Sequence, residues 1–230
     1  MKIKIIAEIG LNHFGKIEII KDYLARVRNK DIDGVSIQIL NKKKTLKKFK
    51  KFALKKSDIK KFLIIAKKDF NNVGVAIHSW DDFKFIKSLK PDFIKILGSS
   101  FGNTKYYNQV KTTKPKRIFL STGGRSIAEI SNFLGKIDKK KLNLLFTFFK
   151  TKNFLKEIKK IQVLKKKFKL NVAFGNHYNN VNYIPKVCFY KPSEIFFYIK
   201  MNKKRNYPDD KHAVSIKNLS QLIKKIKKYD

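Results

Sequence analysis

The chain has 230 residues, 43% of them hydrophobic, with 20 phenylalanines and one cysteine, Cys188. This length suits one large domain with a full core, and a lone cysteine excludes an internal disulfide framework and suits the reducing cytoplasm. The net charge of +38 comes from lysine far more than from arginine. Arginine is the residue that binds phosphates and bases through two hydrogen bonds. We therefore expect a solvated lysine surface and no specific nucleic-acid binding.

Apolar runs of strand length alternate with helical patterns along the chain. The predicted strands are Ile3–Ile9, Gly34–Leu40, Val73–Ile77, Asp92–Leu97, Arg117–Thr122, Leu142–Phe148, Asn171–Phe174 and Glu194–Met201. The predicted helices are Ile17–Val27, Ser57–Phe70, Asp81–Leu89, Ser126–Leu134, Phe154–Phe168 and Ile216–Lys228. Eight strands that alternate with helices predict an α/β protein with a parallel sheet, closed into a single (β/α)8 TIM barrel.

The alternative to a barrel is an open, doubly wound sheet. It lacks its main support, because no Gly-x-Gly-x-x-Gly motif follows any predicted strand. We expect one domain over residues 1–230, since no linker divides the chain. Neither a signal peptide nor a membrane span is predicted, because no apolar run approaches the ~20 residues that a span requires.

Polar residues follow the first predicted strand directly. The run Ile5–Ile9 contains Glu8, and the turn after it carries Asn12 and His13. Because ligands of parallel α/β proteins bind at the carboxyl ends of the strands, these three residues are candidates for a site. An ordinary turn with surface polar groups is the alternative. The four histidines favour the site, since each follows a predicted strand: His13, His78, His177 and His212.

Two further segments indicate that an anion binds. Lys95 is the only charge in the apolar run Phe93–Leu97, where a lysine either points into the barrel or lies at its mouth. After the next strand, residues 121–124 read Ser-Thr-Gly-Gly and precede a predicted helix. Small residues, hydroxyl groups and free N–H groups at a helix start form a cradle for an anion.

These motifs, in this order, resemble the sialic acid synthase family. The matching segments are Ala7-Glu8-Ile9-Gly10-x-Asn12-His13-x-Gly15, Val35–Gln38, Phe93–Ile96, Leu120–Gly123, Asn176-His177, and Arg205–Pro208 with His212. The resemblance runs from Lys4 to about Ile223. It implies a TIM-barrel enzyme that condenses phosphoenolpyruvate with an N-acetylated amino-sugar aldehyde to a nine-carbon 2-keto acid.

The resemblance also implies roles for individual residues. Glu8 and His177 would be catalytic, and His177 with His212 would bind a manganese or magnesium ion that polarises the aldehyde. The implied substrate-binding residues are Asn12, His13, Gln38, Lys95, Ser99, Ser121, Thr122, Asn176 and Arg205. The implied partners are phosphoenolpyruvate and an amino sugar, and the family allows a homodimer.

The sequence departs from the family at four points. Lys200 occupies the place of the second metal-binding histidine, and a protonated lysine binds no metal, so either His212 or His78 replaces it or the metal is lost. Ser36 replaces a basic residue that holds phosphoenolpyruvate, and the cysteine that often follows the sixth strand is replaced within Phe146-Thr147-Phe148. The small antifreeze-like domain that usually follows the barrel has no counterpart before Asp230.

These departures leave alternatives to the enzyme. One is a catalytically degenerate barrel that retains an anion- or sugar-binding pocket, supported by Ser36 and Lys200. Another is an aldolase that forms an imine through Lys200 or Lys95, which requires a desolvated lysine. A nucleic-acid binder rests on the net charge alone.

Overall fold

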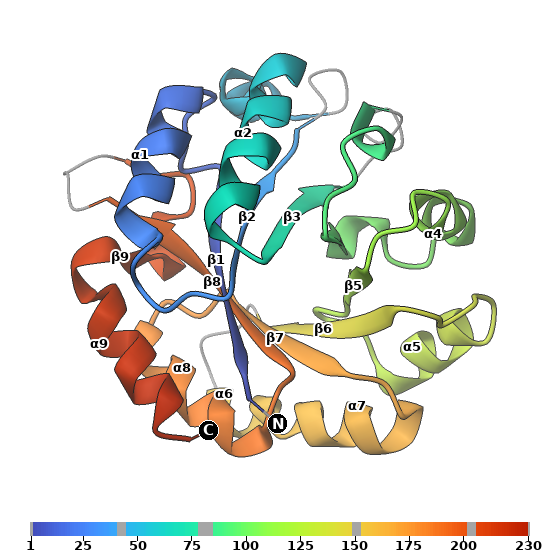
Figure 1. Ribbon diagram of the computed structural model, residues 1–230. Helices are drawn as coiled ribbons and strands as arrows, with labels where there is room; N and C mark the ends of the chain where they lie inside the picture. The colour runs from blue at the N-terminus through green and yellow to red at the C-terminus, as the bar shows by residue number, and fades with distance from the viewer. Residues whose placement is uncertain (1, 41–44, 78–84, 149–152, 202–205, 230) are drawn as a thin grey trace.

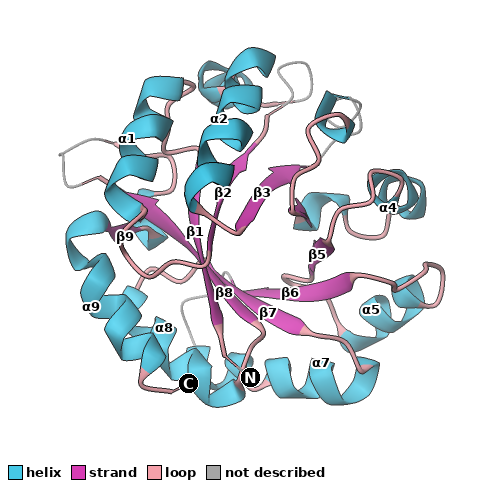
Figure 2. Ribbon diagram, in the orientation of Figure 1, coloured by secondary structure: helices cyan, strands magenta, loops and turns pink. Residues whose placement is uncertain are grey.

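The chain folds into a closed barrel of eight parallel strands, as the strand count predicts (Figures 1 and 2). The computed structural model describes residues 2–40, 45–77, 85–148, 153–201 and 206–229. The strands are β1 Lys4–Gly10, β2 Gly34–Gln38, β3 Asn72–Ile77, β4 Phe93–Ile96, β5 Arg117–Ser121, β6 Leu142–Phe148, β7 Val172–Asn176 and β8 Glu194–Lys200. Each pairs with the next, and β1 also pairs with β8, which closes the sheet.

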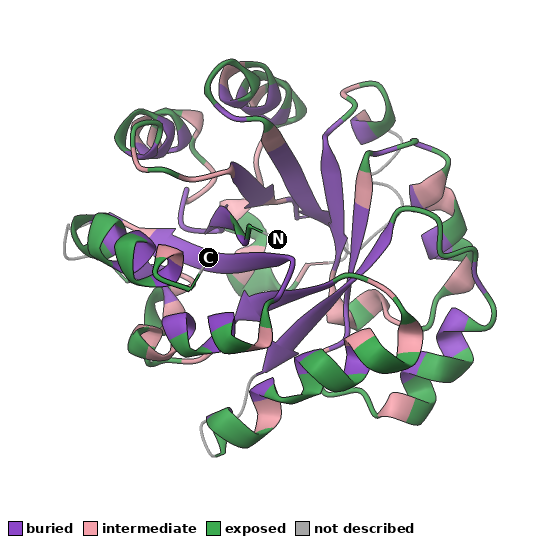
Figure 3. Ribbon diagram, turned by 60° about the horizontal axis from the view of Figure 1, so that its bottom comes forward, coloured by how far each residue is buried: buried purple, intermediate pink, exposed green. Residues whose placement is uncertain are grey.

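Helices surround the barrel and cover its outer face (Figure 3). The described ones are α1 Ile17–Val27, α2 Lys56–Asp69, α4 Thr104–Lys111, α5 Ile127–Leu134, α6 Phe154–Ile158, α7 Lys160–Phe168, α8 Ile184–Val187 and α9 Ile216–Lys227. Their apolar stripes pack on the strands, as Leu219, Ile223 and Ile226 of α9 do, while lysines face outward. None of the described helices is long and apolar enough to cross a bilayer.

Several elements differ from the predictions, and the helix α4 is not among the predicted helices. The helical pattern Phe154–Phe168 forms two helices, α6 and α7, which meet at Lys159. The short helix α8 and a two-residue strand, β9 Val214–Ser215, which pairs with β8, have no clear signal in the sequence. The predicted helix Asp81–Leu89 lies partly outside the described residues.

Side chains along each strand point alternately into and out of the barrel, and the inward-pointing ones form layers in its interior. Successive strand side chains point to opposite faces, so residues two apart point the same way. One layer is an apolar cluster of one residue from each of six strands: Ile6, Phe93, Phe119, Leu145, Ala173 and Phe196. Its three phenylalanine rings meet edge to face, with centroids 4.9–5.7 Å apart. Gly74 makes room for this layer, because a Cβ there would lie 2.2 Å from the Phe93 ring.

The next layer toward the carboxyl ends of the strands is polar. Two residues after Ile6, Phe93, Phe119, Leu145 and Phe196 come Glu8, Lys95, Ser121, Thr147 and Tyr198. All five are buried. The fold therefore places a floor of aromatic rings beneath a polar layer, and this layer opens toward the loops that follow the strands.

Candidate active site

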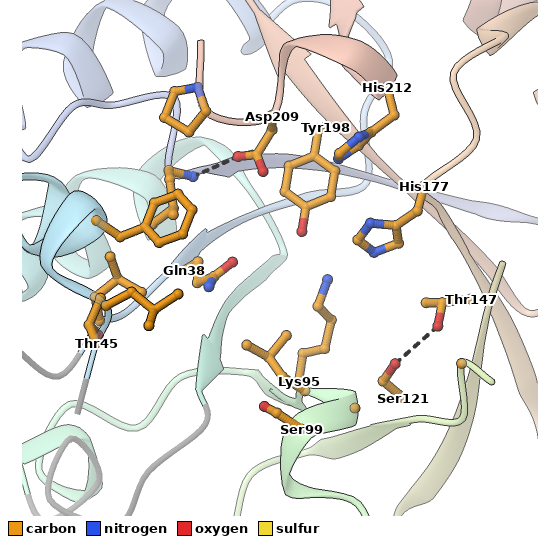
Figure 4. Close-up of a pocket in the computed structure, with 18 of the residues that line it drawn as sticks. Gln38, Thr45, Lys95, Ser99, Ser121, Thr147, His177, Tyr198, Asp209 and His212 are labelled. Atoms are coloured by element: carbon orange, nitrogen blue, oxygen red, sulfur yellow. Dashed lines mark hydrogen bonds between the residues drawn. The ribbon is translucent and has the colours of Figure 1, made fainter. Parts of the chain in front are cut away.

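A cavity of about 720 Å³ lies at the carboxyl ends of the strands (Figure 4). This volume is typical of pockets for small molecules. Its polar lining comes from the carboxyl ends of six strands and the loops after them, and includes Gln38, Thr45, Lys95, Ser99, Ser121, Arg125, Thr147, His177, Tyr198, Asp209 and His212. Leu11, Leu40, Leu46, Phe49 and Leu97 supply much of its apolar side. Of the residues singled out in the sequence, Gln38, Lys95, Ser99, Ser121, His177 and His212 meet in this cavity.

Lys95 and Glu8 form an ion pair inside the barrel. The Lys95 ammonium group donates to Oε1 of Glu8 at 2.5 Å, and each side chain is at most 3% exposed. Ser36 donates to the same oxygen at 3.3 Å. Glu8 is not among the residues that line the cavity. The carboxylate therefore lies beneath the pocket, where it neutralises and orients the lysine that faces the ligand space.

Two imidazoles lie side by side opposite Lys95. The ring centroids of His177, at the end of β7, and His212, in the loop after β8, are 5.1 Å apart. Burial lowers the pKa of both rings, to about 4 for His212, and the positive charge of Lys95 lowers both further. Both histidines are therefore neutral at pH 7 and interact with a ligand as hydrogen-bonding groups.

Asn12 and Asn176 build the loops that carry the site. Asn12 is fully buried; its side chain donates to the carbonyl of Ile199 at 2.9 Å and accepts from the N–H of Asp209 at 3.0 Å. The Asn176 side chain donates to the carbonyl of His212 at 3.3 Å, which holds the loop after β8 against β7. In this structure both amides position other residues of the site.

His13 and Thr122 lie beside the cavity and are not among its lining residues. Nδ1 of His13 accepts from the N–H of Gly15 at 2.9 Å, and burial lowers the pKa of this ring to about 4. The hydroxyl of Thr122 donates to the carbonyl of Leu145 at 3.3 Å, and its side chain lines a second cavity between the barrel and α5. Arg205 and His78 lie outside the described residues.

Lys200 is not among the residues that line the cavity. Its ammonium group is 2.8 Å from a carboxylate oxygen of Asp210 and also donates to the Asp210 carbonyl at 3.1 Å. The place that the sequence assigns to a metal-binding histidine is thus taken by a surface ion pair. His212, twelve residues later in the chain, is the imidazole that lies next to His177.

The donor set of the described residues, which exclude His78, does not fit a resident divalent ion. Catalytic zinc sites use three protein ligands, and the described residues contain no group of three or more histidine, cysteine, aspartate or glutamate side chains arranged to hold an ion. Nε2 of His212 is buried and has no hydrogen-bond partner among the described residues, but His177 is the single imidazole beside it. The charge of Lys95, which disfavours protonation of both rings, also disfavours a cation between them.

Five polar residues of the cavity had no assigned role in the sequence: Thr45, Arg125, Thr147, Tyr198 and Asp209. Thr147 and Tyr198 could have been found from alternation, since they stand two positions after the inward-facing Leu145 and Phe196. Thr147 lies within 3.2 Å of the Ser121 hydroxyl. Arg125 and Asp209 come from loops, where no periodicity predicts the direction of a side chain.

Asp209 is partly buried, and ionisation of its carboxyl group opposes folding. Burial raises its pKa to about 6, with the Glu8 charge adding to the rise, while the N–H of Leu11, which donates to Oδ2 at 3.0 Å, and Lys95 oppose it. A raised pKa means that the folded state binds the proton more tightly than the unfolded state. The stabilisation is complete below pH 3.8 and is lost as the pH rises to about 6.

We therefore expect Asp209→Asn to lose part of the pH dependence of stability. Between pH 4 and pH 6 the free energy of unfolding of the natural chain should fall relative to the variant by on the order of 1–3 kcal/mol. Urea titrations at four pH values measure this difference. Asp210→Asn, which removes the neighbouring exposed carboxylate, is the control. Parallel curves for the natural chain and Asp209→Asn would contradict the assignment.

Known structures share the fold. The N-acetylneuraminic acid (sialic acid) synthetase of Leptospira borgpetersenii, solved with citrate, superposes with a TM-score of 0.89 at 18% identity over 100% of this chain and 84% of its own. The spore coat polysaccharide biosynthesis protein SpsE of Bacillus subtilis gives 0.84 at 17% identity, over 99% and 68%. A truncated 3-deoxy-D-arabino-heptulosonate 7-phosphate synthase of Thermotoga maritima gives 0.79 at 13%, over 98% and 86%.

Comparison at the level of sequence identifies the family. No curated protein sequence matches the chain significantly. The model of the NeuB family, in contrast, matches residues 19–230, which is most of the chain. The match includes the strands that carry Lys95, Ser121, His177 and Tyr198. The chain therefore belongs to the NeuB family, and its TIM-barrel fold agrees with that assignment.

Proposed function

We propose that this chain condenses phosphoenolpyruvate with the aldehyde of an N-acetylated amino sugar to a nine-carbon 2-keto sugar acid. Its membership of the NeuB family supports a biosynthetic role of the sialic acid synthase type. The observation that carries the proposal is the meeting of Lys95, Ser121 and His177 in one cavity, at the end of the barrel where TIM-barrel enzymes bind substrates.

The two sides of the cavity suit two substrates. Lys95, with the hydroxyl groups of Ser99, Ser121 and Thr147, offers a cation and polar groups for the carboxylate and phosphate of phosphoenolpyruvate. The neutral rings of His177 and His212 lie across the cavity and offer hydrogen bonds to the acceptor sugar. Carbon 3 of phosphoenolpyruvate then attacks the aldehyde carbon, water adds to carbon 2, and phosphate leaves.

Thermal unfolding with phosphoenolpyruvate tests the anion site. At 100 times the dissociation constant, a ligand that binds the folded state alone adds about 2.7 kcal/mol of stability. Ser121→Ala should weaken this stabilisation, whereas Ser131→Ala, on the helix α5, should leave it unchanged. Consumption of phosphoenolpyruvate with a panel of N-acetylated amino sugars then tests the reaction. A melting temperature that phosphoenolpyruvate leaves unchanged would overturn the proposal.

A second candidate function is an anion-binding barrel without catalysis. The small number of uncompensated positive charges in the cavity favours it. Glu8 neutralises Lys95, and Ser36 stands where the family has a further basic residue. Stabilisation by phosphoenolpyruvate without turnover on any acceptor would favour this candidate. The imine-forming alternative has a separate test, since borohydride would then trap a covalent adduct of a carbonyl ligand on Lys95.

For the metal, we expect weak binding. His177 and His212 would be its protein ligands, and a bound ion would supply Lewis-acid polarisation of the aldehyde. Because two neutral imidazoles beside Lys95 are a poor site, manganese should raise the melting temperature little, and EDTA should not lower it. The comparison is the natural chain against His212→Ala, by thermal unfolding and by direct manganese titration. Tight, stoichiometric binding that His212→Ala abolishes would contradict this expectation.

A further inference from the structure

We propose that Tyr198 is a catalytic residue, which donates a hydrogen bond and then a proton to the oxygen of the carbonyl group that phosphoenolpyruvate attacks. This inference rests on the proposed function and names the group that activates the acceptor. It is carried by the position of the phenol, by the way its ring is held, and by the protonation states of the groups around it.

Tyr198 is one of the residues that line the cavity. Tyr198 follows Phe196 by two positions on β8, so its side chain points into the barrel one layer above the aromatic floor. Figure 4 shows the hydroxyl pointing toward the Lys95 ammonium group, with His177 beside it. The Lys95 nitrogen lies 5.6 Å from the centroid of the tyrosine ring. A substrate oxygen between the anion side and the histidine side of the cavity would therefore meet this hydroxyl.

The ring is fixed from several directions. The His212 ring packs against it edge to face at 4.8 Å, and the His177 ring lies at 5.4 Å. The backbone of Gly10 also approaches the ring so closely that a Cβ there would be 2.4 Å from a ring carbon. A donor held in this way loses little freedom when a ligand binds, which is the condition for effective stabilisation of a developing negative charge.

Tyr198 is also protonated at neutral pH, as a proton donor must be. Burial raises its pKa well above the usual value, and the charges of Glu8 and Asp209 raise it further, so the phenol remains a donor throughout the neutral range. His177 and His212 carry no extra proton at pH 7, because their pKa values are lowered. The Lys95 ammonium group donates to Glu8 and, under the proposed function, binds the anion of phosphoenolpyruvate.

The step balances in atoms and charge. The double-bond electrons of phosphoenolpyruvate form the new bond from carbon 3 to the aldehyde carbon, and the carbonyl π electrons move to the oxygen. This oxygen, an alkoxide and a stronger base than a phenolate, takes the proton of Tyr198. The phenolate is left beside the Lys95 ammonium group, which lowers its energy. Water then adds to carbon 2 and releases a proton that restores the phenol. Phosphate departs with the electrons of its bond to carbon 2 and takes the proton of the new hydroxyl group, whose oxygen becomes the ketone oxygen of the product.

The test is Tyr198→Phe, which removes the hydroxyl and keeps the ring. We expect kcat for consumption of phosphoenolpyruvate to fall about 100- to 10,000-fold, the usual effect of losing a positioned proton donor. The stabilisation by phosphoenolpyruvate in thermal unfolding should remain as in the natural chain. Tyr207→Phe is the matched control, because Tyr207 is a second buried tyrosine near this end of the barrel, with its ring 5.5 Å from that of Phe14.

Each outcome of this test either supports or overturns the proposed role of Tyr198. An unchanged kcat in Tyr198→Phe overturns the inference and leaves the proposed function standing. Loss of phosphoenolpyruvate binding in the same variant makes Tyr198 a binding residue and overturns its role as proton donor. If the natural chain consumes no phosphoenolpyruvate with any acceptor, the proposed function fails and the inference fails with it. A drop in kcat that Tyr207→Phe does not share, with binding preserved, supports the inference.

Discussion

Lys95→Met should destabilise the chain by about 3–5 kcal/mol, the usual cost of removing one partner of a buried ion pair. The Lys95 ammonium group lies 2.5 Å from Glu8, and both side chains are nearly inaccessible to water. Methionine fills a similar volume but leaves the Glu8 carboxylate without a counter-charge, with the Ser36 hydroxyl as its remaining donor. Urea unfolding at pH 7 measures the loss, and binding of phosphoenolpyruvate should disappear with it.

The double variant Glu8→Leu with Lys95→Met is the control for this result. Apolar replacement of both partners of a buried pair is often neutral or stabilising, so most of the lost stability should return. Binding of phosphoenolpyruvate should not return, because the cation that faces the cavity is absent. If Lys95→Met and the double variant are equally unstable, the cost lies in packing, and the ion pair is not its source.

Much of the fold and part of the site follow from local patterns. Alternation on β4 places Phe93 and Lys95 on one face and Ile94 and Ile96 on the other, so a buried lysine above an aromatic floor can be predicted from the strand alone. The same reasoning applies to Phe119 and Ser121. These residues converge because parallel strands in a barrel bring their carboxyl ends together.

The remaining part of the site depends on contacts between distant segments. The family pattern places Lys200 at the position of the histidine that would lie next to His177. In the structure Lys200 forms an ion pair with Asp210, and the loop after β8 brings the His212 ring next to the His177 ring. The bond from Asn176 to the backbone of His212 spans 36 residues, and the bond from Leu11 to Asp209 spans 198. Neither periodicity nor spacing predicts such bonds.

Gly10→Ala should damage both stability and the site. Gly10 has φ +57°, where a Cβ costs roughly 1–2 kcal/mol, and it follows a β-bulge at which the pairing of β1 with β2 shifts register. The new methyl group would also lie 2.4 Å from the Tyr198 ring and 2.6 Å from Oδ2 of Asp209. Overpacking of this kind costs about 1–3 kcal/mol more, so we expect a total loss of about 2–5 kcal/mol in urea unfolding.

Gly102→Ala separates the two contributions. Gly102 has φ +85°, and a Cβ there would meet no atom within 4 Å, so this variant pays the conformational cost without the overlap. The additional loss in Gly10→Ala then measures how tightly the turn after β1 holds the Tyr198 ring. If Tyr198 acts as proposed, kcat should fall in Gly10→Ala, because the ring must move, and should be unchanged in Gly102→Ala. If both variants lose the same amount of stability, the turn after β1 must shift to accommodate the new methyl group, and this turn does not fix the Tyr198 ring.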